Sequence, residues 1–303
     1  MFHGIYTPSV TPLRDDESID FEGWATHIDR LIGAGINGIL IFGSIGEFYS
    51  FTEEEKREAV DFAVKHVDGR VQLLVGVGNT SLKEACELTA YSAKAGADAV
   101  VAVSPYYFGP SSEVAYRYFA AIAGACDIDV LLYNFPDRTG SDLSPELVAR
   151  LAREFPNIVG IKDTVDTASH TRRILRAVRP FRRDFAVLSG YDEYYLSNRA
   201  SGGNGILTGM TNVEPETFVA LHKAYEAGDF ATVAAKERRV AILMELYEVT
   251  ELFISAIKGG VKVKGVDIST RIKEPACQLT DEQVGRIKEI LALPNETLSS
   301  KAE

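Results

Sequence analysis

The residue with the clearest chemical potential is Lys162, which directly follows the short apolar run of residues 158–161. A run of this kind is typical of a buried strand, and a lysine at its end can be partly desolvated. Desolvation favours the neutral amine, which is a nucleophile. Such an amine forms an imine with a 2-keto acid, and the imine withdraws electrons when a carbon–carbon bond is made or broken. For a single lysine, extension into solvent is the simpler interpretation.

Other polar residues that end apolar runs are suited to the same reaction. The phenol of Tyr133 can transfer protons during imine formation and bond change, and the hydroxyl of Ser44 can relay them. Backbone N–H groups in the glycine-rich residues 43–46 can hold a carboxylate. Taken alone, Tyr133 is equally well explained as an amphipathic residue at a strand end, and Ser44 as a cap of its turn.

Four further residues near strand ends have a structural interpretation beside a functional one. Tyr107 can serve loop packing or a subunit contact, and Arg138 can be a solvated loop cation. For Glu47 we favour capping of its loop through backbone N–H groups over an acid–base role. Asp163 follows Lys162 and can cap the next helix instead of acting on the lysine.

The chain contains eight short apolar runs, each followed by a segment with a helical pattern. Because the runs are apolar throughout and alternate with helices, they predict a parallel sheet that is covered on both faces. Eight units fit a closed (β/α)8 barrel of the TIM type better than an open doubly wound sheet, which would carry a Gly-x-Gly-x-x-Gly motif after its first strand. The expected strands are residues 4–8, 37–42, 72–75, 99–103, 130–132, 158–161, 185–188 and 205–207.

The predicted fold class is therefore α/β, with a C-terminal helical extension. We expect residues 1–225 to form the barrel that carries the active site, and residues 226–303 to form a helical layer packed on it. The first helix is predicted over residues 21–32, ended by Gly33, and a long helix of the layer over residues 230–250.

A barrel of this type places the carboxyl ends of all its strands on one face, and its chemistry lies there. Residues that are far apart in the sequence therefore meet around one opening. We expect this opening to contain Ser44, Tyr107, Tyr133, Lys162 and Gly190.

Composition narrows the class of protein. Hydrophobic residues make up 46% of the 303 residues, which suits a large core, and the net charge of -11 argues against nucleic acid or an anionic membrane as a partner. No apolar run is long enough to span a bilayer, and the beginning of the chain lacks the pattern of a signal peptide. Cys86, Cys126 and Cys277 are far apart and predict reduced thiols, so we expect a cytoplasmic protein.

Other kinds of catalysis have little support in the sequence. The five histidines are scattered without the spacing of metal ligands, which disfavours a metal-dependent aldolase and predicts no metal site. The chain also lacks a Gly-x-Ser-x-Gly motif and a phosphate-binding P-loop. We expect an enzyme without a cofactor.

The motifs in residues 43–47, 104–107, 133–140 and 160–163 resemble those of the dihydrodipicolinate synthase / N-acetylneuraminate lyase family of class I aldolases, and the similarity runs over essentially the whole chain. The resemblance implies a lyase that forms a Schiff base with pyruvate, and it implies a homotetramer built as a dimer of dimers. The implied catalytic residues are Lys162 for the Schiff base, Tyr133 as general acid and base, Ser44 as a proton relay, and Tyr107 from a neighbouring subunit. The implied substrate-binding residues are Ile45 with the backbone beside it, Arg138, Gly190 and Leu207.

The second substrate is less well defined by the motifs. Synthases of the family usually carry a second hydroxyl residue where this chain has Ile45, whereas Arg138 matches the arginine that binds aspartate semialdehyde in those enzymes. Residues 46–48, 133–136, 162–166 and 189–192 resemble the 2-keto-3-deoxy-gluconate aldolase branch. We favour cleavage of a 2-keto-3-deoxy sugar acid into pyruvate and an aldehyde. The alternatives are 4-hydroxy-tetrahydrodipicolinate synthase, a keto-deoxy sugar acid dehydratase, and a non-catalytic keto-acid-binding protein.

Overall fold

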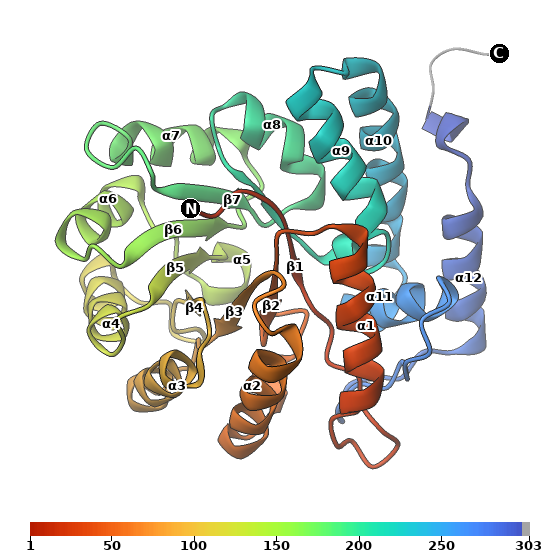
Figure 1. Cartoon of the computed structure of the whole chain (residues 1–303), viewed down its shortest axis with the longest axis horizontal. Coiled ribbons are helices and arrows are strands. Elements are labelled where there is room, and N and C mark those ends of the chain that lie inside the picture. Colours follow the sequence, from red (N-terminus) through yellow and green to blue (C-terminus); the bar gives the residue numbers. More distant parts are fainter. Residues whose placement is uncertain (299–303) are drawn as a thin grey trace.

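The computed structural model describes residues 1–298 and contains a closed barrel of eight parallel strands in the order β1 to β8 (Figure 1). The predicted α/β barrel is confirmed. Each expected strand is present, with ends that differ by a few residues. The strands are β1 (Gly4–Pro8), β2 (Gly38–Ile41), β3 (Gln72–Gly76), β4 (Ala99–Val103), β5 (Asp129–Asn134), β6 (Ile158–Asp163), β7 (Ala186–Ser189) and β8 (Gly205–Leu207).

Helices follow the strands and surround the barrel, and local capping residues set where several of them begin. Thr52 and Glu55 form a reciprocal capping box at the start of α2, and the Ser144 side chain accepts from Leu147 N at the start of α6. The surrounding helices are α1 (Phe21–Ala34), α2 (Glu53–Val67), α3 (Leu82–Ala95), α4 (Ser112–Gly124), α6 (Pro145–Glu154), α7 (Ala168–Val178), α8 (Tyr195–Ala200) and α9 (Pro215–Ala227). The short α5 (Pro136–Thr139) follows β5 directly and lies at the mouth of the barrel.

The remaining helices are α10 (Phe230–Leu243), α11 (Phe253–Val263) and α12 (Asp281–Ala292). They lie together on one side of the barrel, where α10 packs on α9 and α11 packs on α12 (Figure 1). The expected division after residue 225 falls inside the last turn of α9, so the layer begins after Ala227. The division into two domains stays a prediction, and the last five residues of the predicted layer lie outside the described residues.

Two helix ends differ from the predictions. Gly33 lies inside α1, which ends at Ala34, and the capping residue Gly35 takes a left-handed conformation with φ of 93°. A glycine within a helix costs only about 1 kcal/mol, so the rest of the helix can carry it. The predicted helix over residues 230–250 stops at Leu243 and continues as a 3-10 turn, Met244–Glu248, from which Tyr247 reaches the barrel.

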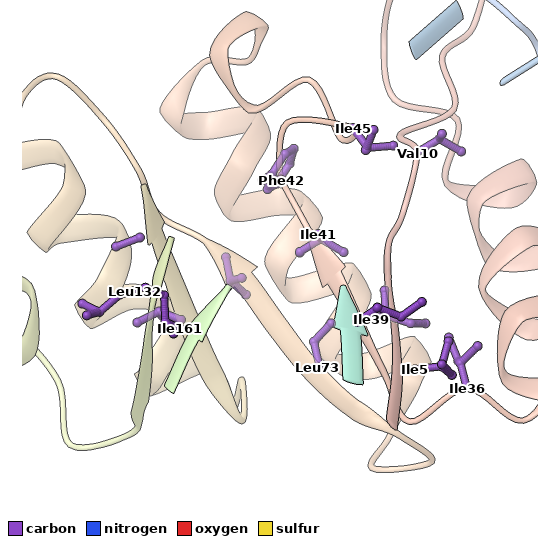
Figure 2. Packing of buried hydrophobic residues seen from close by; sticks show 14 of the residues in the cluster. Ile5, Val10, Ile36, Ile39, Ile41, Phe42, Ile45, Leu73, Leu132 and Ile161 are labelled. Atoms are coloured by element: carbon purple, nitrogen blue, oxygen red, sulfur yellow. The ribbon is translucent and has the colours of Figure 1, made fainter. Parts of the chain in front are cut away.

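The apolar core has two parts because strand residues alternate between the outside and the inside of the barrel. On β2, Ile39 and Ile41 face the helices, whereas Leu40 belongs to the cluster inside the barrel. Figure 2 shows part of the outer cluster, in which Ile45 lies beside Val10. The same alternation directs Leu132 and Ile161 outward, so that their successors Tyr133 and Lys162 face inward.

Among residues 1–298, none of the helices combines the length and the apolar character that a membrane crossing requires. The three cysteines lie within the described residues and form no disulfide there.

Candidate active site

Tyr133 and Lys162 face each other at the carboxyl end of the barrel. They are direct partners in the register of β5 and β6, so the fold places them side by side although 28 residues separate them in sequence. Both side chains are buried, and Lys162 Nζ lies 4.2 Å from the centre of the Tyr133 ring. The amine and the phenol are therefore close enough to act on one bound molecule.

Ser44 completes this group from the loop after β2. Its Oγ lies 3.2 Å from the Tyr133 hydroxyl, within hydrogen-bonding distance. The loop is tightly folded, since Gly46 N donates to Gly43 O at 3.0 Å and Glu47 N donates to Ser44 O at 3.1 Å. Among the described residues, the backbone N–H groups of Ser44 and Ile45 donate to no other backbone or side-chain acceptor. They are suited to holding a carboxylate.

A cavity of about 640 Å³ opens above these residues. Polar residues at its wall that the sequence did not single out include Glu193, Thr208, Tyr247 and Glu248. Thr164 and Asp192, which lie in segments that resemble the aldolase branch, also line it. The cavity also contains six of the predicted site residues, which the structure thus brings together: Ser44, Ile45, Tyr133, Arg138, Lys162 and Gly190.

Two predicted site residues lie elsewhere. Leu207 is fully buried in the apolar cluster inside the barrel, and its neighbour Thr208 lines the cavity in its place. Thr208 lies one residue beyond the end of β8, nearer the cavity, whereas Leu207 lies deeper inside the barrel. Tyr107 is 86% exposed beside Phe108, in a loop where its own φ is 78°. Its contribution to the cavity of a neighbouring subunit stays a prediction.

A second cavity of about 810 Å³ adjoins the first. The two share the side chains of Ser44, Phe135, Arg138 and Phe253. The guanidinium of Arg138 lies 6.0 Å from the ring centres of Phe135 and Phe253, so the arginine stands between the two spaces. Arg138 is therefore placed where a long substrate would extend away from Lys162.

Glu47 does not cap its loop, and that prediction is wrong. Its side chain makes no capping hydrogen bond and instead forms a buried ion pair with Lys258 of α11, whose Nζ lies 2.5 Å from Glu47 Oε1. Lys258 also donates to the carbonyl of Arg271 at 2.7 Å. Burial lowers the pKa of Lys258, and the charge of Glu47 opposes this. The available sequence signal was a lysine inside the mainly apolar residues 253–261 of α11.

We expect removal of this cation alone to be strongly destabilising, because it leaves a carboxylate buried without a partner. Lys258→Met should lower the free energy of unfolding by about 3–5 kcal/mol, measured by urea denaturation. The double variant Glu47→Met/Lys258→Met should recover most of that loss, since both charges are then gone. A double variant that is no more stable than Lys258→Met would contradict the pairing.

Asp163 also has a role other than the predicted helix cap. Its carboxylate accepts from Asn134 Nδ2 at 3.1 Å and lies 2.9 Å from Nδ1 of His170, a buried residue of α7. On its other side, His170 Nε2 is 3.4 Å from Asp142. Burial alone would lower the pKa of His170, but the hydrogen bonds and charges of Asp142 and Asp163 outweigh burial and raise it to about 9.

This raised pKa predicts a dependence of stability on pH. Below the unfolded-state value of 6.5 the contribution of His170 is fully present, and it is lost progressively as the pH rises towards about 9. A shift of this size corresponds to about 3 kcal/mol. Urea denaturation at pH values from about 6 to about 10 should show this decline in stability in the wild type. His170→Gln should flatten it, and an unchanged slope in that variant would exclude His170 as the source.

Asp192 is a further buried carboxylate at the cavity wall. It accepts from the Tyr247 hydroxyl at 2.7 Å and from Met210 N at 3.0 Å. Burial raises the pKa of Asp192 and that of Tyr247. These bonds attach the 3-10 turn after α10 to the barrel mouth, so the C-terminal layer supplies part of the cavity wall.

The described histidines include one pair that the sequence did not bring together. His3 and His222 lie near Glu226, with possible ligand atoms within 4.8 Å of one another. Arg199 donates to the Glu226 carboxylate at 2.6 Å, so an ion pair already holds this group. Because His3 precedes β1, the group lies at the amino end of the barrel, away from Lys162.

A parallel barrel with an inward lysine, an adjacent phenol and a serine defines a class I aldolase type of site. The sequence as a whole matches the model described as the dihydrodipicolinate synthetase family over residues 1–293. The chain belongs to this family and is a lyase.

Among its relatives, the chain is 37% identical to the putative 2-dehydro-3-deoxy-D-gluconate aldolase YagE of Escherichia coli K12, over 96% of both chains. It is 35% identical to the probable 2-dehydro-3-deoxy-D-pentonate aldolase YjhH of the same organism, again over 96% of both. A 4-hydroxy-tetrahydrodipicolinate synthase of Methanoculleus marisnigri is 36% identical, over 96% of this chain and 99% of that one. The crystal structure of YagE in complex with pyruvate superposes with a TM-score of 0.94, covering 96% of this chain and 98% of the other.

Proposed function

We propose that this lyase cleaves a 2-keto-3-deoxy sugar acid into pyruvate and an aldehyde through a Schiff base on Lys162. The observation that carries the proposal is the meeting of Lys162, Tyr133 and Ser44 in one cavity, with an amine over a phenol and the phenol bonded to a hydroxyl. The similarity to the two sugar-acid aldolases supports the choice of substrate.

The reaction begins when Lys162 Nζ attacks the C2 carbonyl of the substrate. The carbonyl oxygen leaves as water, for which Tyr133 supplies a proton, and a protonated imine remains. The substrate carboxylate lies against the free N–H groups of Ser44 and Ile45, which fixes C2 below the amine.

Cleavage then needs a base for the C4 hydroxyl. Tyr133, as the phenolate, takes that proton, the C3–C4 bond breaks, and its electron pair moves to C3 and on to the imine nitrogen as an enamine. The aldehyde leaves through the cavity. Protonation of the enamine at C3 and addition of water to the imine release pyruvate and restore the amine. Ser44 passes protons to and from Tyr133, and Tyr107 of a second copy extends this relay in the proposed homotetramer.

The walls of the cavity support a hydroxylated aldehyde as the second product. Four carboxylate side chains and several hydroxyls surround the space beyond Lys162, and they can accept hydrogen bonds from substrate hydroxyls. Arg138 is the other cation beside Lys162 among the lining residues. The acidic lining residues are Asp137, Asp192, Glu193 and Glu248. Ile45, which packs near Val10, supplies apolar contact where a synthase usually has a hydroxyl (Figure 2).

A paired assay tests the substrate. We expect the protein to release pyruvate from 2-keto-3-deoxy-gluconate, detected by coupling to lactate dehydrogenase, and to consume little pyruvate with aspartate semialdehyde. Arg138 supports the synthase as the second candidate, since a guanidinium is suited to a second carboxylate. Pyruvate consumption that depends on the semialdehyde, without release from the sugar acid, would replace the proposal with that candidate.

A further inference from the structure

The two catalytic side chains have an outward-facing counterpart on the same strands. Tyr133 and Lys162 are register partners that face the inside of the barrel, and the next pair in the register is Asn134 and Asp163. Because strand residues alternate, the side chains of this second pair face the helices instead. Both are buried. Contacts that hold Asn134 and Asp163 in place therefore also restrain Tyr133 and Lys162, which are their immediate neighbours in the chain.

The second pair is the centre of a closed network. Asn134 Nδ2 donates to Asp163 Oδ1 at 3.1 Å and to Asp142 Oδ1 at 2.8 Å. The side-chain oxygen of Asn134 accepts a hydrogen bond from Leu143 N at 3.0 Å, and this bond fixes the loop that carries Asp142. The backbone is tied at the same level, since Thr164 N donates to Asn134 O at 2.8 Å. The ends of β5 and β6 are thus joined through both side chains and main chain.

His170 closes the network from α7. Its Nδ1 lies 2.9 and 3.0 Å from the two oxygens of Asp163, and its Nε2 lies 3.4 Å from Asp142. Nδ1 lies within hydrogen-bonding distance of Asp163, whereas Nε2 faces Asp142 at ion-pair distance and forms no hydrogen bond with a described residue. A proton on each nitrogen places a positive charge between the two carboxylates. The His170 side chain is 3% exposed, whereas Asp142 is 49% exposed, so the contact with Asp163 is the buried one. Arg173, about one turn further along α7, places a second positive charge near Asp142.

We propose that His170 is a positioning residue for the reaction, and that its imidazolium holds Asp163 and Asp142 so that Tyr133 stays opposite Lys162. The inference rests on the proposed function insofar as these two residues perform the chemistry. Without the cation, two carboxylates would share Asn134 with no positive charge between them, and their repulsion would separate the strand ends. A small displacement of this kind is enough to slow a reaction between positioned groups.

The test compares two buried histidines. His170→Gln should slow formation of the borohydride-trapped pyruvate adduct, and kcat with it, by at least about tenfold, while KM changes by less than about twofold. His27→Gln is the matched control, because His27 is equally buried but bonds to Asn212, away from the ends of β5 and β6. Both variants should be less stable than the wild type, but only His170→Gln should show slower adduct formation and a lower kcat.

A second variant covers the case in which His170→Gln does not fold. Asp142→Asn removes the half-exposed carboxylate and should slow adduct formation in the same direction, with a smaller effect. Normal adduct formation in both His170→Gln and Asp142→Asn would overturn the positioning role, as would equal slowing in His27→Gln. The adduct assay needs no aldehyde. The positioning role of His170 can therefore still be tested if the wild type traps pyruvate but does not cleave the sugar acid. A wild type that traps no pyruvate would overturn both proposals.

Discussion

Lys162→Ala is expected to abolish the pyruvate adduct and to remove measurable turnover. The amine of Lys162 is buried beneath the cavity beside Tyr133, and the substitution leaves no other amine on that strand end to form an imine. Incubation with pyruvate and borohydride, followed by peptide mass spectrometry, measures the adduct directly. The wild type should carry it at Lys162.

The control for this experiment is Lys288→Ala, which removes an exposed lysine of α12 that lines neither cavity. It should leave the adduct and turnover at wild-type values. Lys273 is the informative competitor, because it lines the adjoining larger cavity. An adduct that persists in Lys162→Ala, or that maps to Lys273 in the wild type, would exclude the proposed Schiff base.

Tyr133→Phe should reduce kcat by about a hundredfold or more, the usual effect of removing a positioned acid–base group. The ring would remain under Lys162, so binding should change little. The lost hydroxyl is the one that bonds to Ser44 at 3.2 Å, and it is the group assigned to proton transfer at both the imine and the C4 hydroxyl. Steady-state release of pyruvate from the sugar acid measures the effect.

Tyr6→Phe serves as the matched control for Tyr133→Phe. Tyr6 belongs to the same cluster inside the barrel, and its hydroxyl donates to Gln72. Its removal should lower stability by about 1 kcal/mol and leave kcat unchanged. If Tyr133→Phe retained wild-type kcat, the acid–base role would have to pass to another group at the cavity wall, such as Tyr247.

Lys162, Tyr133 and Ser44 could be grouped from sequence because each ends an apolar run, and a parallel barrel gathers such ends on one face. The same periodicity defines the eight strands. Leu207 shows the limit of this reasoning. Only the resemblance to the family assigned Leu207 to the substrate, and three apolar residues do not show how far their strand reaches towards the cavity, which Thr208 lines instead.

Long-range polar pairs were beyond the reach of sequence reasoning for a different reason. Glu47 and Lys258 are 211 residues apart, and His170 meets Asp142 only because α7 packs beside the loop before α6. Such partners have no common local pattern, since their contact is created by packing. Glu47 and Asp163 therefore received local capping roles, whereas the structure pairs Glu47 with Lys258 of α11 and Asp163 with His170 of α7.

The ion pair between Glu47 and Lys258 limits how freely the C-terminal layer can be exchanged. Glu47 lies three residues after Ser44, in the loop that holds the proton relay, and Lys258 lies in α11 of the layer. A chimera that replaced everything after α9 with the segment of a relative would bury Glu47 without its counter-ion unless the new segment supplied a cation there. The C-terminal helices and the loop after β2 should therefore be exchanged together, although the strands of the barrel close without either of them.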